Sequence, residues 1–185
     1  MKQRIHKSKK QKTWVWPLIV LILAISLSLS FSLLSELVLD GSALIIAIIV
    51  IFAFVTLAIV TDMLGLAVAS ANIEHFTAMA ARKVKGSKQA ISLVKNADKV
   101  SSVLNDVIGD VCGILSGAAG ASIVTKIAID NGGSFMSILI PSLVAAIIAG
   151  ITIFGKAILK RLAIKHANPI TLHFAKFLNF FTRKG

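Results

Sequence analysis

Residues 101–121 read SSVLNDVIGDVCGILSGAAGA, a stretch that is apolar enough for a lipid bilayer and yet contains two acidic residues. An aspartate at the centre of a bilayer costs roughly 2.5–3.5 kcal/mol, so we expect the helix face that carries these acids to lie against protein. Steps of three and four residues place two aspartates and three glycines on that one face of a helix. They are Asp106, Asp110, Gly113, Gly117 and Gly120.

Small residues also recur at every fourth position of this stretch, from Gly109 through Gly113 and Gly117 to Ala121. This spacing is typical of membrane helices whose backbones approach each other closely. The sequence predicts a helix contact along this glycine ridge. It leaves open whether the ridge packs within one chain or against a second copy.

The acids have two interpretations. Asn105 and Asp106 are either functional or simply polar residues that lie in the headgroup layer at the end of a span. Asp110 lies four residues further along, about 6 Å deeper into the apolar stretch. An acid inside a span is by default a functional-site hypothesis, most often a cation or proton site.

The composition indicates a membrane protein. Hydrophobic residues make up 56% of the 185 residues, the mean hydropathy is +0.87, and the apolar residues cluster in runs of about twenty, the length that spans a bilayer. We predict an all-α, polytopic membrane protein with four transmembrane helices plus basic amphipathic cytoplasmic helices. A basic tail covers 1–13, the spans cover about 14–39, 43–70, 103–129 and 135–159, and the amphipathic segments cover 72–99 and 166–183.

The cations predict the orientation. Nineteen of the twenty Lys and Arg residues lie in the N-terminal tail, between Arg82 and Lys99, or from Lys156 onward. The positive-inside rule therefore places both termini in the cytoplasm of a multi-pass cell-membrane protein. Because the cations flank spans, we expect membrane lipids and no nucleic acid as partners. A signal peptide is the other interpretation of the N-terminus, although its apolar run exceeds twenty residues.

The sequence offers no pattern for catalysis. A nucleophile beside a base, a metal triad or a phosphate-binding loop would be needed, and GSKQAIS at 86–92 lacks the upstream glycine of a P-loop. The single cysteine, Cys112, has no partner for an intrachain disulfide and no metal-ligand spacing. We predict that the chain is not an enzyme and that it has no cofactor.

Two stretches carry a resemblance to a known family. KGSKQAISLVKNADKVSSVLNDVIGDVCGI at 85–114 and IFGKAILKRLAIKHANPITLHFAKFLNF at 153–180 resemble the transmembrane domain of the CorB/CorC (CNNM-type) magnesium transport family. The resemblance covers residues 43–185. In that domain a basic amphipathic stretch precedes a span that opens with a Gly-Asn-rich cluster, and the last span closes on Phe-Gly-Glu-x-x-Pro-Lys.

The resemblance implies an ion site and also departs from the family pattern at that site. Asn105 falls on a glycine of the family's polar cluster, Asp106 and Asp110 fall on its asparagines, and Asp62 falls on a serine of the preceding span. It implies Asp62, Asp106 and Asp110 as metal ligands, with Asn105 adding an oxygen. Lys156, however, stands where the closing motif has its glutamate.

The resemblance also bears on partners. It implies a homodimer, to which the ridge from Gly109 to Gly120 would contribute. The span at 14–39 is extra relative to the family. The chain ends at Gly185 without the nucleotide-sensing CBS pair found in many members, so regulation of that kind would need a separate regulatory chain.

Two functions remain open at this point. The first is a divalent-cation transporter related to the CorB/CorC family, with Mg²⁺ as the transported ion, because carboxylate and amide oxygens suit that ion. The second is a non-transporting structural or regulatory membrane subunit built on the same fold. The direction of the Lys156 side chain separates them, since an ammonium among the acids either pairs with them or repels a dication.

Overall fold

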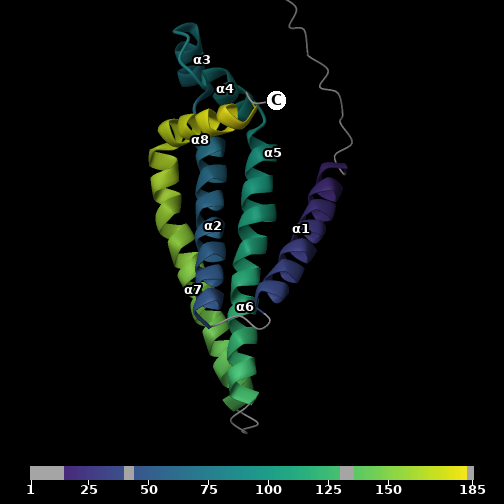
Figure 1. The fold of residues 1–185 in the computed structure, drawn as a ribbon. Coiled ribbons are helices and arrows are strands. Elements are labelled where there is room, and N and C mark those ends of the chain that lie inside the picture. The colour runs from purple at the N-terminus through teal and green to yellow at the C-terminus, as the bar shows by residue number, and fades with distance from the viewer. Residues whose placement is uncertain (1–14, 40–43, 130–135, 183–185) are drawn as a thin grey trace, which may run out of the picture.

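A computed structural model of the protein describes residues 15–39, 44–129 and 136–182, so the basic tail at 1–13 lies outside the described part. Every element in the described part is a helix, which confirms the all-α prediction. The elements are α1 (Val15–Leu39), α2 (Leu44–Ser70), α3 (Ile73–Ala81), α4 (Ser87–Lys95), α5 (Ala97–Ser102), η1 (Val103–Gly109), α6 (Asp110–Ile129), α7 (Met136–Lys165) and α8 (Ala167–Thr182) (Figure 1).

Four of the described helical segments are long and apolar enough to cross a membrane, as predicted, so the chain has the architecture of a multi-pass membrane protein. α1, α2 and α7 each supply one segment. α5, η1 and α6 run on from one another and supply the fourth, from Ala97 to Thr125. α7 continues to Lys165, six residues beyond the expected end of the last span.

α2, α6 and α7 form a three-helix bundle (Figure 1). α8 lies across one end of this bundle, and α3 and α4 lie beyond α8 on the same side. We call α3, α4 and α8 the cap. The start of α1 and the start of α5 lie at the capped end as well.

The corner between α7 and α8 follows from a proline. Pro169 lies in the first turn of α8, and a helical Pro169 within a continuous helix would clash with the carbonyl of Lys165. α7 ends at that residue, and His166 alone separates the two helices. The amide of His166 still donates to Leu162 O at 2.9 Å, and the amide of Ile170 donates to His166 O at 3.1 Å. The chain therefore turns sharply without losing these backbone hydrogen bonds.

The cap has its own small core. Phe76 of α3, Ala90 of α4 and Ala175 of α8 are fully buried against one another. Gly86 joins α3 to α4 with φ +86°, a left-handed conformation that favours glycine. The chain therefore turns tightly before α4, and the two short helices pack onto α8.

Polar contacts fix the cap to the bundle. Asn72 caps α3 through a 2.8 Å hydrogen bond from the Glu74 amide to its side-chain oxygen. The Asn72 amide donates in turn to Asn168 Oδ1 at 2.9 Å, which connects the end of α2 to the start of α8. Across the cap, Gln89 Nε2 donates to Asn179 Oδ1 at 2.8 Å.

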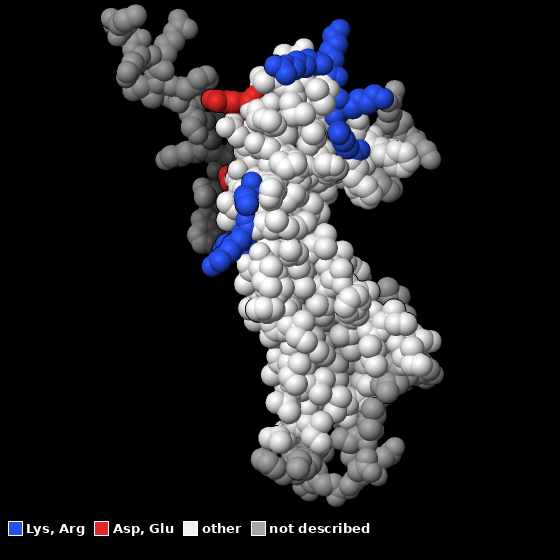
Figure 2. Space-filling view, turned by 90° about the vertical axis from the view of Figure 1, so that its left-hand side faces the viewer, with Lys and Arg blue, Asp and Glu red and all other residues white. Residues whose placement is uncertain are grey.

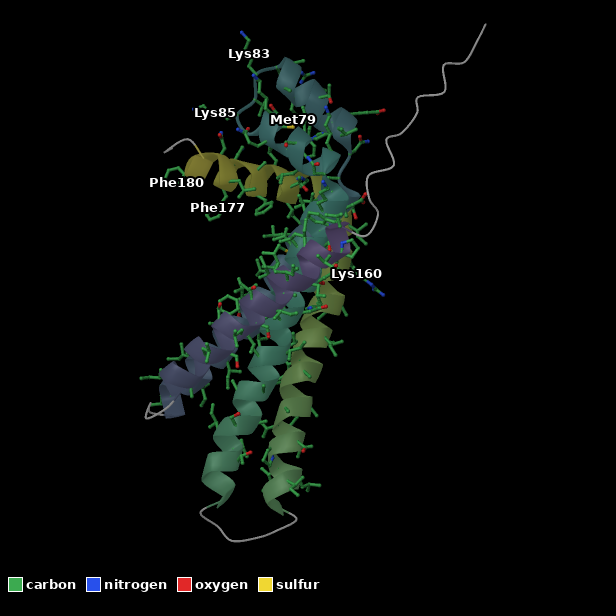
Figure 3. The ribbon with its side chains drawn as sticks, turned by 90° about the vertical axis from the view of Figure 1, so that its right-hand side faces the viewer. Met79, Lys83, Lys85, Lys160, Phe177 and Phe180 are labelled. Carbon is green, nitrogen blue, oxygen red and sulfur yellow. The ribbon has the colours of Figure 1, made fainter. Side chains whose placement is uncertain are left out.

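Charges gather over the capped half of the molecule. On the face shown in Figure 2, the lysines and arginines lie over the cap and the adjoining part of the bundle, and the described surface of the other half carries no charged residue. Lys83 and Lys85 point away from the bundle at the edge of the cap, whereas Phe177 points from α8 to the bundle side (Figure 3). The cap therefore carries cations on its outer side and an aromatic side chain on the side of the bundle.

α1 packs on the bundle much more sparsely. None of its apolar segment from Val15 to Leu33 is buried inside the protein. Phe31 meets Phe54 of α2 edge-on with 5.8 Å between ring centroids, and Lys99 Nζ lies 5.2 Å from the ring centroid of Trp16. Most of α1 is therefore available to lipid.

Candidate functional site

Three charged side chains meet between α2, α6 and α7. Lys156 Nζ donates to Asp110 Oδ1 at 2.8 Å and lies 3.9 Å from Asp62 Oδ1. We call Asp62, Asp110 and Lys156 the ion-pair cluster. The side chains of Lys156 and Asp62 are each 19% exposed, and that of Asp110 is 61% exposed. Lys156 and Asp62 are thus largely shielded from the surroundings of the protein, whereas the Asp110 carboxylate is accessible.

Small residues on α6 and α7 put the cluster together. A Cβ on Gly113 of α6 would lie 3.8 Å from Thr152 Cγ2, so the two helices are in close contact there. Asp110 precedes Gly113 by three residues and Lys156 follows Thr152 by four, that is, about one turn toward the cap on each helix. The glycine contact thereby sets the lysine opposite the aspartate.

α2 joins through a second glycine. A Cβ on Gly155 of α7 would lie 2.5 Å from Ile59 Cδ1, which shows how closely α7 approaches α2. Asp62 lies three residues after Ile59, on the same side of α2 and next to Lys156. Asp62 is about 27 Å from the start of α2 and about 12 Å from its end at Ser70, so the cluster lies in the part of the bundle nearest the cap.

The helix changes its hydrogen bonding beside the cluster. Residues Val103–Gly109 form the π-helix η1, between α5 and α6. π-helical turns are rare and occur frequently at functional sites. A Cβ on Gly109 would lie 3.4 Å from both Ala58 O and Thr61 Oγ1, so η1 approaches the backbone of α2 closely.

Asn105 projects from η1 into a space that Gly65 provides on α2. A Cβ on Gly65 would overlap Asn105 Oδ1 and lie 2.7 Å from its Cγ, so the amide fits only against glycine. Asn105 Oδ1 is buried and has no hydrogen-bond partner within the described chain. An orphaned carbonyl oxygen is costly, which makes Asn105 a candidate oxygen ligand.

Asp106 lies outside the ion-pair cluster. Its Oδ2 accepts a 2.9 Å hydrogen bond from Ser102 Oγ, one turn earlier, and the residue is exposed. Of the three acids implied as metal ligands, the structure thus brings Asp62 and Asp110 to one lysine and places Asp106 with a serine. Among the described residues, no group of three or more His, Cys, Asp or Glu side chains is arranged to hold a metal ion.

The glycine ridge faces other helices of the same chain. Gly109 faces α2, whereas Gly113, Gly117 and Gly120 face α7. The nearest atom to a Cβ on Gly117 would be Ala145 O at 3.9 Å, and a Cβ on Gly120 would overlap Ile148 Cδ1. The ridge is therefore used for packing within the chain.

Sequence reasoning missed Ser102 and Thr152 as parts of this region. Ser102 stands four residues before Asp106, a spacing that favours a side-chain hydrogen bond along a helix. Thr152 is buried, and its hydroxyl donates to Ile148 O at 2.8 Å, so that only its methyl group faces Gly113. Thr152 carries no signal of its own in the sequence, because its role depends on which helix lies opposite.

Comparison of the chain with protein-family models, with curated proteins and with solved structures finds no match.

Proposed function

We propose that this chain is a non-transporting structural or regulatory membrane subunit, in which Lys156 takes the position that a transported cation would need. The observation that carries this proposal is the 2.8 Å contact of Lys156 Nζ with Asp110 Oδ1, with Asp62 Oδ1 3.9 Å from the same nitrogen. An ammonium next to two carboxylates supplies positive charge to both without a metal and offsets one of their two negative charges. It also repels a dication that approaches the same oxygens.

The cluster has a structural role in this proposal. In lipid there is no hydrophobic force that drives one apolar helix against another, so polar contacts and close packing hold the helices together. Lys156 of α7 contacts an acid on α2 and an acid on α6. It therefore holds the three helices of the bundle in one relative position. Removal of the lysine would leave two carboxylates without a counter-charge.

Magnesium flux into proteoliposomes tests the proposal. We expect wild type to show no flux above empty vesicles, and Asp110→Asn to behave in the same way. Flux gained only in Lys156→Glu supports the proposal, because one charge then closes the site. Lys160→Glu is the matched control, since Lys160 lies one turn further along α7 and points away from the bundle (Figure 3). Wild-type flux that Asp110→Asn lowers would overturn the proposal.

Magnesium transport of the CorB/CorC type is the second candidate, and Asn105 is the observation that favours it. Its buried Oδ1 has no partner in the described chain, and amide and carboxylate oxygens suit Mg²⁺, which also keeps several waters. The 61% exposure of Asp110 leaves that carboxylate open to an arriving ion. This candidate predicts wild-type flux that is lost in Asn105→Ala.

We further propose a cell-membrane location with both termini and the cap in the cytoplasm. The cations at the capped end support this orientation through the positive-inside rule. Lys83→Cys in a Cys112→Ser background tests it. A membrane-impermeant maleimide should label the new cysteine in inside-out vesicles, and labelling in right-side-out vesicles instead would reverse the orientation.

A homodimer remains part of the proposal. Asp110 is exposed in the isolated chain although it belongs to a membrane-spanning helix, and a second copy that covers this face would shield the carboxylate. The mass of the purified protein in detergent tests this, and a monomeric mass at all concentrations would contradict it.

We also retain the prediction that the chain is not an enzyme.

A further inference from the structure

An open apolar groove of about 350 Å³ lies between the start of α1 and the capped end of the bundle. Trp16 of α1, Val100 of α5, Leu104 of η1 and Phe174 of α8 contribute to its walls. The surface of the groove is apolar throughout, and Lys99 is the one charged residue among those that line it. The groove exists because α1 is splayed from the bundle and contacts it sparsely.

Lys99 supplies one positive charge to this groove. Its Nζ lies 5.2 Å from the ring centroid of Trp16, a cation–π contact that occupies one side of the ammonium and leaves its other N–H donors accessible. Lys99 is exposed and makes no ion pair with any residue of the described ranges. A tryptophan beside a lysine at the end of a span is also the usual composition of a membrane interface.

The geometry points to a site for one anionic phospholipid in this groove, with an acyl chain against the apolar walls and the phosphate on Lys99. Lipid is the solvent at the sides of the spans, and an anionic lipid combines an apolar chain with a negative group at the required end. A second groove, lined by Met63, Leu162 and Phe174 between α2, α7 and α8, has histidines in place of a lysine. The charge therefore favours the groove beside α1. This inference is independent of whether the chain carries magnesium.

Trp16 provides a local readout. The chain has two tryptophans, so Trp14→Phe leaves Trp16 as the sole one. The protein is reconstituted in phosphatidylcholine with a fixed minor fraction of brominated lipid, which quenches a tryptophan on contact. We expect brominated phosphatidylglycerol to quench Trp16 with about fivefold higher apparent affinity than brominated phosphatidylcholine, the ratio that corresponds to about 1 kcal/mol per lysine near a membrane surface.

Two variants in the Trp14→Phe background complete the test. Lys99→Gln should bring the affinity ratio to about one, and Lys160→Gln should leave it unchanged, because Lys160 belongs to α7, which contributes no residue to the groove. Equal quenching by the two lipids before mutation would overturn the inference. So would a preference that survives Lys99→Gln, or one that both variants lower equally, since that result indicates diffuse attraction rather than a site. Lys99→Arg, which retains the charge, should keep the preference.

Discussion

Gly65 and Gly120 both lie at close helix–helix contacts, but different kinds of atom surround the two glycines. Beside Gly65 is the amide of Asn105, in a π-helical segment close to Asp62, Asp110 and Lys156. Beside Gly120 are only aliphatic atoms of α7, and the helix there is a regular α-helix. We refer to these regions as the capped half and the far half of the bundle.

The difference shows that small residues serve two purposes in this bundle. In the far half they allow α6 and α7 to approach each other. In the capped half, Gly65 makes room for a polar side chain that a membrane otherwise disfavours. The spacing of glycines therefore predicts a close helix contact, but it does not predict which chemical group lies opposite each glycine.

Loss of the lysine should give the largest effect on the capped half. Lys156→Met leaves Asp62 and Asp110 without their cation. Asp62 is 19% exposed and Asp110 is 61% exposed. The loss of unfolding free energy should therefore lie between the values for breaking a buried ion pair and a surface ion pair, at roughly 2–3 kcal/mol. Thermal unfolding in detergent measures it. Lys160→Met is the matched control, and equal loss in both variants would show that the cluster has no special role.

Gly65→Ala should have the next largest effect. The new methyl group overlaps Asn105 Oδ1 and also meets Cγ at 2.7 Å, so rotation of the amide does not relieve the contact. Overpacking of this kind costs roughly 1–3 kcal/mol. Asn105→Ala removes the obstructing group, and the double variant should regain most of the stability. If Gly65→Ala is equally harmful with and without Asn105, the two residues do not compete for one space.

Gly120→Ala should have the smallest effect. Its methyl group overlaps only Ile148 Cδ1, the end of a flexible side chain, and the next atoms are 3.6 Å away or more. A rotamer change relieves the overlap, and the better helix propensity of alanine offsets the rest, so we expect a change within about 0.5 kcal/mol. Gly150→Ala, with no heavy atom within 4 Å, is the control in the same assay. A loss at Gly120 as large as that at Gly65 would remove the distinction between the two halves.

The spans could be predicted because they depend on a local quantity. Runs of about twenty apolar residues have few alternatives to a membrane helix, and the described residues contain four such segments. The cations from Lys156 onward suggested an earlier end to the last span. Nothing among them breaks a helix, however, and α7 continues until Pro169 prevents it at Lys165.

The site could be predicted only in part. Asp110 was singled out as an acid within an apolar run, and Asp62 was singled out through the family resemblance. Their convergence on Lys156 depends on the Gly113 and Gly155 contacts, which set the rotation of α7 about its axis. The π-helix η1 was not expected, because periodicity of apolar residues does not distinguish one extra residue per turn. The pairing of Asn105 with Gly65 depends on how η1 packs against α2, which no local pattern in the sequence specifies.

The order of the three charges along the chain has a consequence for biosynthesis. A ribosome delivers Asp62 first, then Asp110, and Lys156 only with the last of the four spans. Throughout that interval both acids enter the membrane without the cation that later compensates them, at a cost that disfavours their settling deep in lipid. We therefore expect α2 and α6 to reach their final arrangement only after α7 has been translated. On this view α7, the last helix of the bundle to be synthesised, is the one that completes it.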